Sequence, residues 1–307
     1  MRYKLTLSYN GGGFSGWAKQ PSRRTVQEEL ELALAKVVPH QTKREFLTPI
    51  STIVAGRTDA GVHARNQIVH FDSCIDLAPF RIFSSGAVPE LELEHSSRSE
   101  ENHKLLPNRQ QEYINFLHKL NSVLPEDIVA KEIEQVPDDF SARFWATSRV
   151  YKYRICDNPC RYDPIHSDDV ALIRHVLDVD KMNQAVKPLV GLNDFSAFVK
   201  PRKGQTAVRD LFRFDFERNS ENSVIVATLH ADAFAYNMVR SLVGSAILVG
   251  LEKRPAQWIE EKLKEKTREG ATGPTAAKGL TFDEVRYDLP YDEAREREKQ
   301  IKAQRAV

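Results

Sequence analysis

In the first half of the chain, the spacing of apolar residues switches between the period of two typical of strands and the longer period typical of helices. Tyr3–Tyr9 has apolar residues at alternate positions, which predicts a strand. Thr25-Val-Gln-Glu28 is a capping box, and the helix expected behind it has the apolar face Val26, Leu30, Leu34 and Val37. The other elements predicted here are strands at Ser51–Ala55, Gln67–Phe71 and Ile128–Val136, and a helix at Gln110–Asn121.

The second half repeats this succession of strands and helices. Its predicted elements are strands at Arg149–Ile155, Val208–Glu217, Val224–Ala231 and Phe282–Tyr287, and helices at Lys181–Val190, from Phe234 onward and around Trp258. Most of these strands alternate apolar and polar residues, whereas strands of parallel sheets are usually apolar throughout. We therefore expect an α+β protein with two mainly antiparallel sheets, each backed by helices on one side.

The composition along the chain predicts where these units begin and end. Residues 1–138 are expected to form one α+β domain, and residues 139–290 a second. Residues 84–108 are rich in Ser and Glu and lack periodicity, which predicts an exposed polar insertion in the first domain. The charged tail at 291–307 is expected to fray.

The net charge does not indicate a nucleic-acid partner, but local clusters of basic residues are compatible with one. The chain has 307 residues, of which 44 are basic and 43 acidic, so its formal net charge of +1 gives no overall positive field. Basic residues instead cluster at 22–24, 149–154 and 200–204. Such local clusters can form a basic face for nucleic acid, or can be solvated surface charge.

Other features favour a cytoplasmic protein without a membrane partner. The three cysteines, Cys74, Cys156 and Cys160, match no zinc spacing and are interpreted as reduced thiols. The N-terminus lacks the apolar segment of a signal peptide. The longest apolar run, Met238–Leu251, contains Arg240 and is too short to cross a bilayer.

The stretch AGRTDAGVHA, Ala55–Ala64, places Asp59 on a loop between two predicted strands. Loops held by rigid elements commonly carry catalytic groups. An aspartate with an ordinary pKa of about 3.9 is ionised at neutral pH and can act directly as a nucleophile. Aspartates in loops also form Asx-turns, and the residue alone does not separate the two roles.

Arg240 is the second candidate. It lies in a predicted helix, Phe234–Gly244, that is apolar on nearly all sides, so its guanidinium is expected to be buried. A buried charge needs a partner. No acidic residue follows Asp232 within a turn, so the partner is expected from a distant segment, and Asp59 and other structural acids are both candidates.

Tyr151 is the third candidate, on the predicted strand Arg149–Ile155. Alternation places Tyr151 and Tyr153 on one face, and Lys152 and Arg154 on the other. Aromatic residues on a sheet near basic groups can stack on bases, although tyrosines in strands often belong to the core.

A metal-dependent hydrolase is a disfavoured alternative. Asp59, His63, His70 and Asp72 are possible ligands, but they form no metal-binding spacing, and no Gly-x-Ser-x-Gly elbow supports a serine hydrolase.

The loop and its surroundings resemble one known family. AGRTDAGVHA is similar to the signature of the TruA-type tRNA pseudouridine synthases. The resemblance extends in order along the chain through Leu7–Trp17, Arg24–Glu28, Leu120–Pro125, Pro137–Phe144, Tyr151–Arg154, Phe234–Gly244 and Ala277–Leu280. It covers nearly everything from Arg2 to Tyr287, and an ordered set of this kind is specific.

The resemblance implies two similar ferredoxin-like or RRM-like domains with the active cleft between them. It implies a homodimer in which one tRNA contacts both subunits. The implied reaction converts uridine to pseudouridine at positions 38, 39 and 40 of the anticodon stem-loop, with no metal and no organic cofactor.

The resemblance also implies roles for five residues. Asp59 would be the nucleophile or base, paired with Arg240. Tyr151 would stack on the target uracil and help to take the C5 proton, and Leu280 would line the uracil pocket. Arg57 would fill the space left by the flipped nucleotide. A non-catalytic tRNA-binding module is the alternative, but it would not need the carboxylate of Asp59.

Overall fold

The computed structural model describes residues 1–38, 50–78, 113–200 and 206–306, with side chains described up to residue 300. The predicted insertion at 84–108 and most of the basic cluster at 200–204 lie outside these ranges. No helix in the described ranges is long and apolar enough to cross a bilayer.

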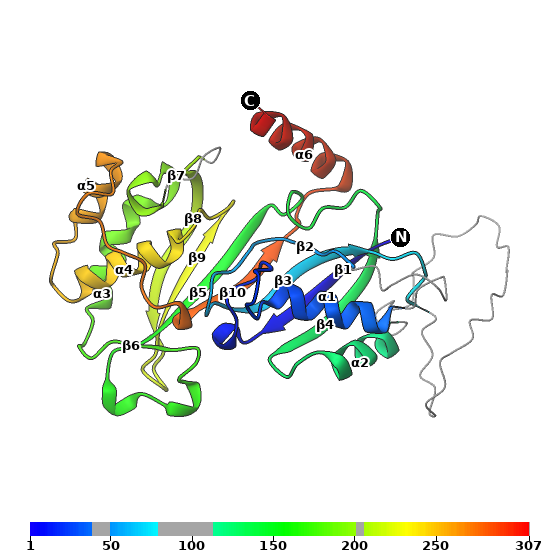
Figure 1. The fold of residues 1–307 in the computed structure, drawn as a ribbon. Coiled ribbons are helices and arrows are strands. Elements are labelled where there is room, and N and C mark those ends of the chain that lie inside the picture. The colour runs from blue at the N-terminus through cyan, green and yellow to red at the C-terminus, as the bar shows by residue number, and fades with distance from the viewer. Residues whose placement is uncertain (39–49, 79–112, 201–205, 307) are drawn as a thin grey trace.

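Among the described residues, ten strands form one sheet, in which the order of the main strands is β4-β1-β3-β10-β5-β9-β8-β7 (Figure 1). The strands are β1 (Arg2–Tyr9), β2 (Ile53–Val54), β3 (His63–Asp72), β4 (Ile128–Val136), β5 (Ser148–Cys156), β6 (Ala171–Leu172), β7 (Gly191–Asp194), β8 (Val208–Arg218), β9 (Ile225–Ala231) and β10 (Leu280–Arg286). Short β2 pairs with β3, and short β6 pairs with β5. The sheet is largely antiparallel, as the alternating strands predicted.

The expectation of two separate sheets is wrong. Strand β10 pairs in parallel with β3 through Thr281 and Phe282, and antiparallel with β5 along its length. Backbone donors and acceptors are the same in every strand, so alternation predicts a strand without predicting its neighbours. The domain boundaries at 138 and 290 remain a prediction.

The helices are α1 (Val26–Val37), α2 (Ile114–Val123), α3 (Val179–Val186), α4 (Met238–Gly250), α5 (Trp258–Glu265) and α6 (Tyr291–Ala306). Helix α1 begins at Val26 as predicted, although the Thr25 side chain makes no capping hydrogen bond. Two short 3₁₀ helices matter for the site: η1 (Gly11–Gly13) and η7 (Ala277–Gly279).

Helices α1 to α4 cover one face of this sheet in two groups, and α5 lies beyond α3 (Figure 1). Helices α1 and α2 pack on β1, β3 and β4, whereas α3 and α4 share an apolar cluster with β5, β8 and β9, and α5 packs on α3. Phe282 is opposite Ala64 on one side and Tyr151 on the other, and paired residues point to the same face. The two helical groups therefore cover the same face, with Phe282 and Tyr151 at their junction.

The first turns of the tail that was expected to fray form part of helix α6 and are docked on the rest of the protein. Ala294 is 2% exposed in a third apolar cluster with Phe140 and Trp145. Trp145 donates its indole N–H to Glu298 Oε2 at 2.8 Å, and Arg295 forms an ion pair with Asp139. Tertiary contacts thus order a segment that has little apolar surface of its own.

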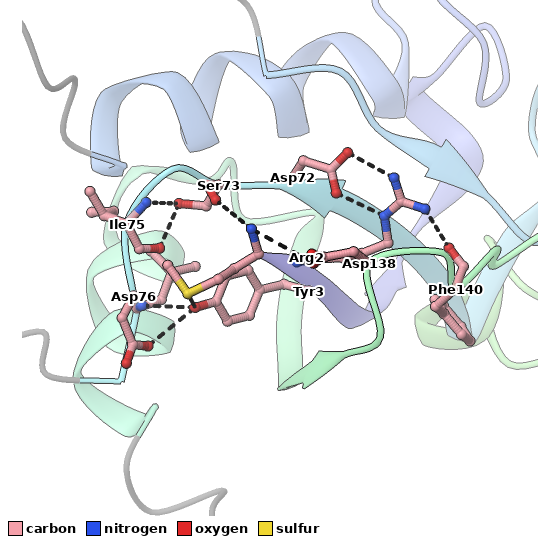
Figure 2. A network of polar contacts seen from close by, with 10 residues as sticks. Arg2, Tyr3, Asp72, Ser73, Ile75, Asp76, Asp138 and Phe140 are labelled. Carbon is pink, nitrogen blue, oxygen red and sulfur yellow. Dashed lines mark hydrogen bonds and ion pairs between the residues drawn. The ribbon is translucent and has the colours of Figure 1, made fainter. Parts of the chain in front are cut away.

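Polar contacts hold the first residues of β1 to Asp72 at the end of β3, to the residues that follow it, and to the segment around Phe140 (Figure 2). Arg2 donates to both carboxylate oxygens of Asp72, at 2.7 and 2.8 Å, and to the Phe140 carbonyl at 2.8 Å. The hydrogen bond from Arg2 holds the pKa of Asp72 below its usual value. Asp72 is thus engaged in joining β1 to β3.

Candidate active site

Asp59 lies on the loop between β2 and β3, and the first half of the chain holds this loop by its backbone. The Trp17 N–H donates to Thr58 O at 3.0 Å, and the Gly61 N–H donates to Phe14 O at 3.3 Å. Within the loop, Val62 N–H donates to Asp59 O at 3.1 Å, and Gly61 adopts a φ of +76° that suits glycine. The carboxylate is therefore carried on a tightly turned backbone.

Buried side chains add further bonds to the same loop. The Tyr9 hydroxyl is 2.8 Å from Thr58 Oγ1, and Gln67 Nε2 donates to Gly56 O at 2.8 Å. Tyr9 and Gln67 lie on β1 and β3, so the sheet itself supports the loop. Supporting contacts of this kind keep a catalytic group in a fixed geometry.

The loop faces residues from the second half of the chain. A Cβ on Gly56 would lie 3.1 Å from the Phe282 ring, and a Cβ on Gly61 would lie 3.2 Å from Ala277 Cβ. The Tyr151 ring makes edge contacts with Phe282 and with Phe234, each at 5.1 Å between centroids. The Asp59 loop thus lies against the junction that carries Tyr151.

Electrostatics also couple Tyr151 to Asp59. Burial raises the pKa of the Tyr151 phenol above its usual value, Tyr9 and the Asp59 carboxylate raise it further, and Arg149 opposes the shift. The phenol is therefore neutral at physiological pH. Both Asp59 and Tyr151 are half-buried, so each retains some access to a ligand.

Arg240 differs from its prediction in burial: it is half-buried on the first turn of α4. Its Nε donates to Thr275 O at 2.7 Å, and its Nη1 donates to Asn237 Oδ1 at 3.4 Å. The Thr275 N–H in turn donates to Arg240 O at 3.3 Å. Arg240 thus fixes the segment that leads into η7, and its pairing with Asp59 remains a prediction.

The two remaining predicted residues lie close to these elements. Arg57 is exposed, two residues before Asp59. Leu280 is 5% exposed at the start of β10, paired with Tyr153 of β5. Their roles toward a flipped nucleotide and a uracil ring remain predictions.

His63 has a role that sequence reasoning missed. Its Nδ1 accepts the Gly11 N–H at 3.1 Å, and its Nε2 lies 3.1 Å from Lys278 O. With Nδ1 as an acceptor, the proton is on Nε2, which donates to Lys278 O. In the sequence, the only sign that His63 matters was its position in AGRTDAGVHA, and it was considered only as a possible metal ligand.

The possible metal ligands are not brought together. His63 and Asp72 occupy opposite ends of β3, and His70 Nδ1 accepts the Ala142 N–H at 3.0 Å. Within the described ranges, no three His, Cys, Asp or Glu side chains are grouped as a metal ion would require.

Lys152 and Arg154 of β5 lie on the face of the sheet opposite to Tyr151, as alternation predicted. Lys152 forms an ion pair with Asp283 at 2.8 Å, and Arg154 donates to Thr281 Oγ1 at 3.1 Å.

Known proteins are similar to the chain over nearly its whole length. A family model described as tRNA pseudouridine synthase matches residues 185–288. The chain is similar to tRNA pseudouridine synthase A of Bifidobacterium longum, with 35% identity over 100% of this chain and 99% of the relative. It is 40% identical to the Streptomyces griseus protein of that name, over 94% of this chain and 88% of the relative. The Cutibacterium acnes protein of that name is 37% identical, over 95% of this chain and 90% of the relative.

Proposed function

The chain belongs to the tRNA pseudouridine synthase family, and from this premise we propose that it modifies uridines 38, 39 and 40 of the tRNA anticodon stem-loop, with Asp59 as nucleophile. Membership makes the protein an isomerase that converts uridine to pseudouridine in RNA. The observation that supports Asp59 is its position. Its loop is held by Trp17, Phe14 and Gln67 and lies against the junction that carries Tyr151.

The reaction requires a group that acts at the ribose or the base. The N-glycosidic bond of uridine breaks, the uracil turns, and a bond forms from C5 of the base to C1′ of the ribose. A carboxylate can attack C1′ or C6, or can remove a ribose proton, and each route needs it beside the target nucleotide. The rigid loop meets that need, because misplacement of a reacting group by about 1 Å can cost about 100-fold in rate.

The roles proposed for the other four residues come from the family resemblance. Arg240 is proposed to keep Asp59 ionised and oriented. Tyr151, neutral and half-buried, is proposed to stack on the uracil and to assist removal of the C5 proton. The exposed Arg57 is proposed to fill the gap left by the flipped nucleotide, and Leu280 to line the uracil pocket.

The proposal includes a homodimer that binds one tRNA across both subunits, works in the cytoplasm and uses no metal or organic cofactor. Equilibrium sedimentation at several protein concentrations measures the first point. A species with the mass of a single chain, 35.0 kDa, at micromolar concentration would contradict the dimer.

The function is tested by tritium release from a tRNA transcript labelled at uridine C5. We expect release by the wild type, no release by Asp59→Asn, and equal tRNA affinity for both. Asp163→Asn is the matched control, because Asp163 is also a loop aspartate and caps a 3₁₀ helix by accepting the Ile165 N–H. Wild-type release by Asp59→Asn would contradict the nucleophile. Pseudouridines mapped outside positions 38, 39 and 40 would contradict the target site alone.

A further inference from the structure

Arg149 has an unusual set of partners for a guanidinium. Its four hydrogen bonds all go to backbone carbonyls: Nη1 donates to Asp232 O at 2.7 Å and Ala146 O at 3.3 Å, and Nη2 donates to Arg143 O at 2.9 Å and Ala55 O at 3.3 Å. The guanidinium is half-buried, and burial lowers its pKa from the usual value. A charge held in this way marks a position where the protein needs the geometry of the fork.

The four carbonyls belong to three separate parts of the chain. Ala55 begins the stretch that carries Asp59, and its own N–H donates to Ile68 O of β3 at 2.8 Å. Asp232 directly follows β9 and begins the connection through Phe234 to α4, which carries Arg240. Arg143 and Ala146 lie in the segment just before β5.

Arg149 itself lies on β5, two residues before Tyr151 and therefore on the same face of the strand. Strand β10 separates β5 from β3 in the sheet. The Arg149 side chain thus bridges directly from the strand of Tyr151 to the start of the Asp59 loop. The bonds of Trp17, Phe14 and Gln67 attach that loop to the first half of the chain.

We propose that Arg149 is a positioning residue for the isomerisation, whose guanidinium holds the start of the Asp59 loop in register with Tyr151 and with the connection to α4. This inference rests on the proposed role of Asp59. Arg149 acts through the backbone that it binds, and it needs no contact with the tRNA.

The role depends on a planar fork with donors on two sides. Nη2 points to Ala55 and Nη1 points to Asp232, so one group serves both directions at once. A lysine ammonium keeps the charge but places all its donors on one atom, so it cannot span both carbonyls. Lysine therefore separates a geometric role from a purely electrostatic one.

The chain offers a matched control in Arg297 of α6. Its Nη1 donates to Ala146 O at 3.0 Å, the same carbonyl that Arg149 binds. Arg297 thus shares the structural part of the arrangement, and its described hydrogen bond goes to neither Ala55 nor Asp232.

The test compares R149K, R149Q and R297Q with the wild type under single-turnover conditions, with saturating tRNA labelled at uridine C5. The assay temperature is well below the melting temperature of each variant. We expect R149Q to be slower by about 100-fold and R149K by about 10-fold or more, with tRNA dissociation constants within about 3-fold of wild type. R297Q should remain within about 2-fold of the wild-type rate.

Hydrogen exchange gives a second readout that does not depend on turnover. The amides of residues 56–62 should exchange faster in R149K than in the wild type and in R297Q. We expect R149K to fold even if R149Q does not, because lysine retains the charge and an aliphatic stem.

A wild-type rate in R149K would overturn the inference, as would a loss of tRNA affinity that accounts for the whole loss of rate. Asp59→Asn, measured alongside, reports on the proposed function separately. If Asp59→Asn is inactive but the Arg149 variants react at the wild-type rate, only the positioning role is contradicted. An active Asp59→Asn contradicts the nucleophile and, with it, the reason for positioning the loop.

Discussion

His70 makes the stability of this protein depend on pH in a defined window. The side chain is 3% exposed on β3, and its Nδ1 accepts the Ala142 N–H at 3.0 Å. Burial, assisted by the positive charge of Arg2, lowers the pKa of His70 from 6.5 to about 4. Protonation of the folded protein would place a proton on the nitrogen that accepts this bond.

The sign and size of the effect follow from proton linkage. Between pH 6.5 and 4 the unfolded chain binds a proton at His70 that the folded chain does not, so acid favours unfolding in this window. With a pKa of about 4 when folded and 6.5 when unfolded, the free energy of unfolding falls by about 2 kcal/mol between pH 7.5 and pH 5. Below the folded pKa the contribution is lost completely and levels off.

The assay is urea unfolding, followed by tryptophan fluorescence at a series of pH values from 7.5 to 5. Carboxylates also titrate at the acidic end, so the comparison is made with His70→Asn. The amide oxygen of H70N can accept the Ala142 N–H in place of Nδ1, and it does not titrate. We expect the wild type to lose about 2 kcal/mol more than H70N over this range.

Parallel curves for the two proteins would refute this reasoning. They would mean that the folded protein accommodates the charged imidazole, for example by rotation of His70 away from Ala142 and toward Asp72.

Two further predictions concern packing and a buried charge. Gly279→Ala should destabilise the protein by about 1–3 kcal/mol and lower its activity. The new Cβ would lie 2.7 Å from the Tyr153 ring and 2.8 Å from Arg154 O, and it would displace η7 against the Asp59 loop. Gly273→Ala is the control: its Cβ would have nothing within 4 Å, so this variant should have the melting temperature of the wild type. Burial alone would raise the pKa of Asp157, but Arg218 and the Leu177 N–H together lower it. Asp157→Asn should therefore lower the free energy of unfolding in urea by about 2 kcal/mol, since the carboxylate is 2% exposed and Arg218 is about one-third exposed. The control is Asp215→Asn, which breaks the exposed ion pair with Arg213. An equal loss of stability in the two variants would contradict this prediction.

Much of the local structure could be read from the sequence because burial of one face imposes a period. The alternating residues of β1 and β5 point where predicted, with Tyr151 and Tyr153 on the helix-covered face. The helix predicted at Lys181–Val190 instead ends at Val186 and continues as a 3₁₀ turn, because Pro188 lacks the N–H that an α-helix requires.

The candidate site could be predicted only in part. AGRTDAGVHA indicated a loop between two strands, and the structure has that loop between β2 and β3. The apolar pattern around Arg240 suggested full burial, but the first turn of α4 lies at the edge of the core and leaves the guanidinium half-buried. Helical periodicity predicts which face of a helix is buried, but it does not predict how far that burial extends toward the end of the helix.

The sequence by itself therefore determined most of the longer strands and helices, the alternation of faces along β5, and which loop carries Asp59, but it did not indicate β6, β7 or helix α6. Only the tertiary structure decided that β10 joins the halves into one sheet, and that His63 and Arg149 tie the Asp59 loop to the second half of the chain. The reason is physical. Side-chain periodicity encodes burial, whereas strand partners and carbonyl contacts use backbone groups that are identical at nearly every residue.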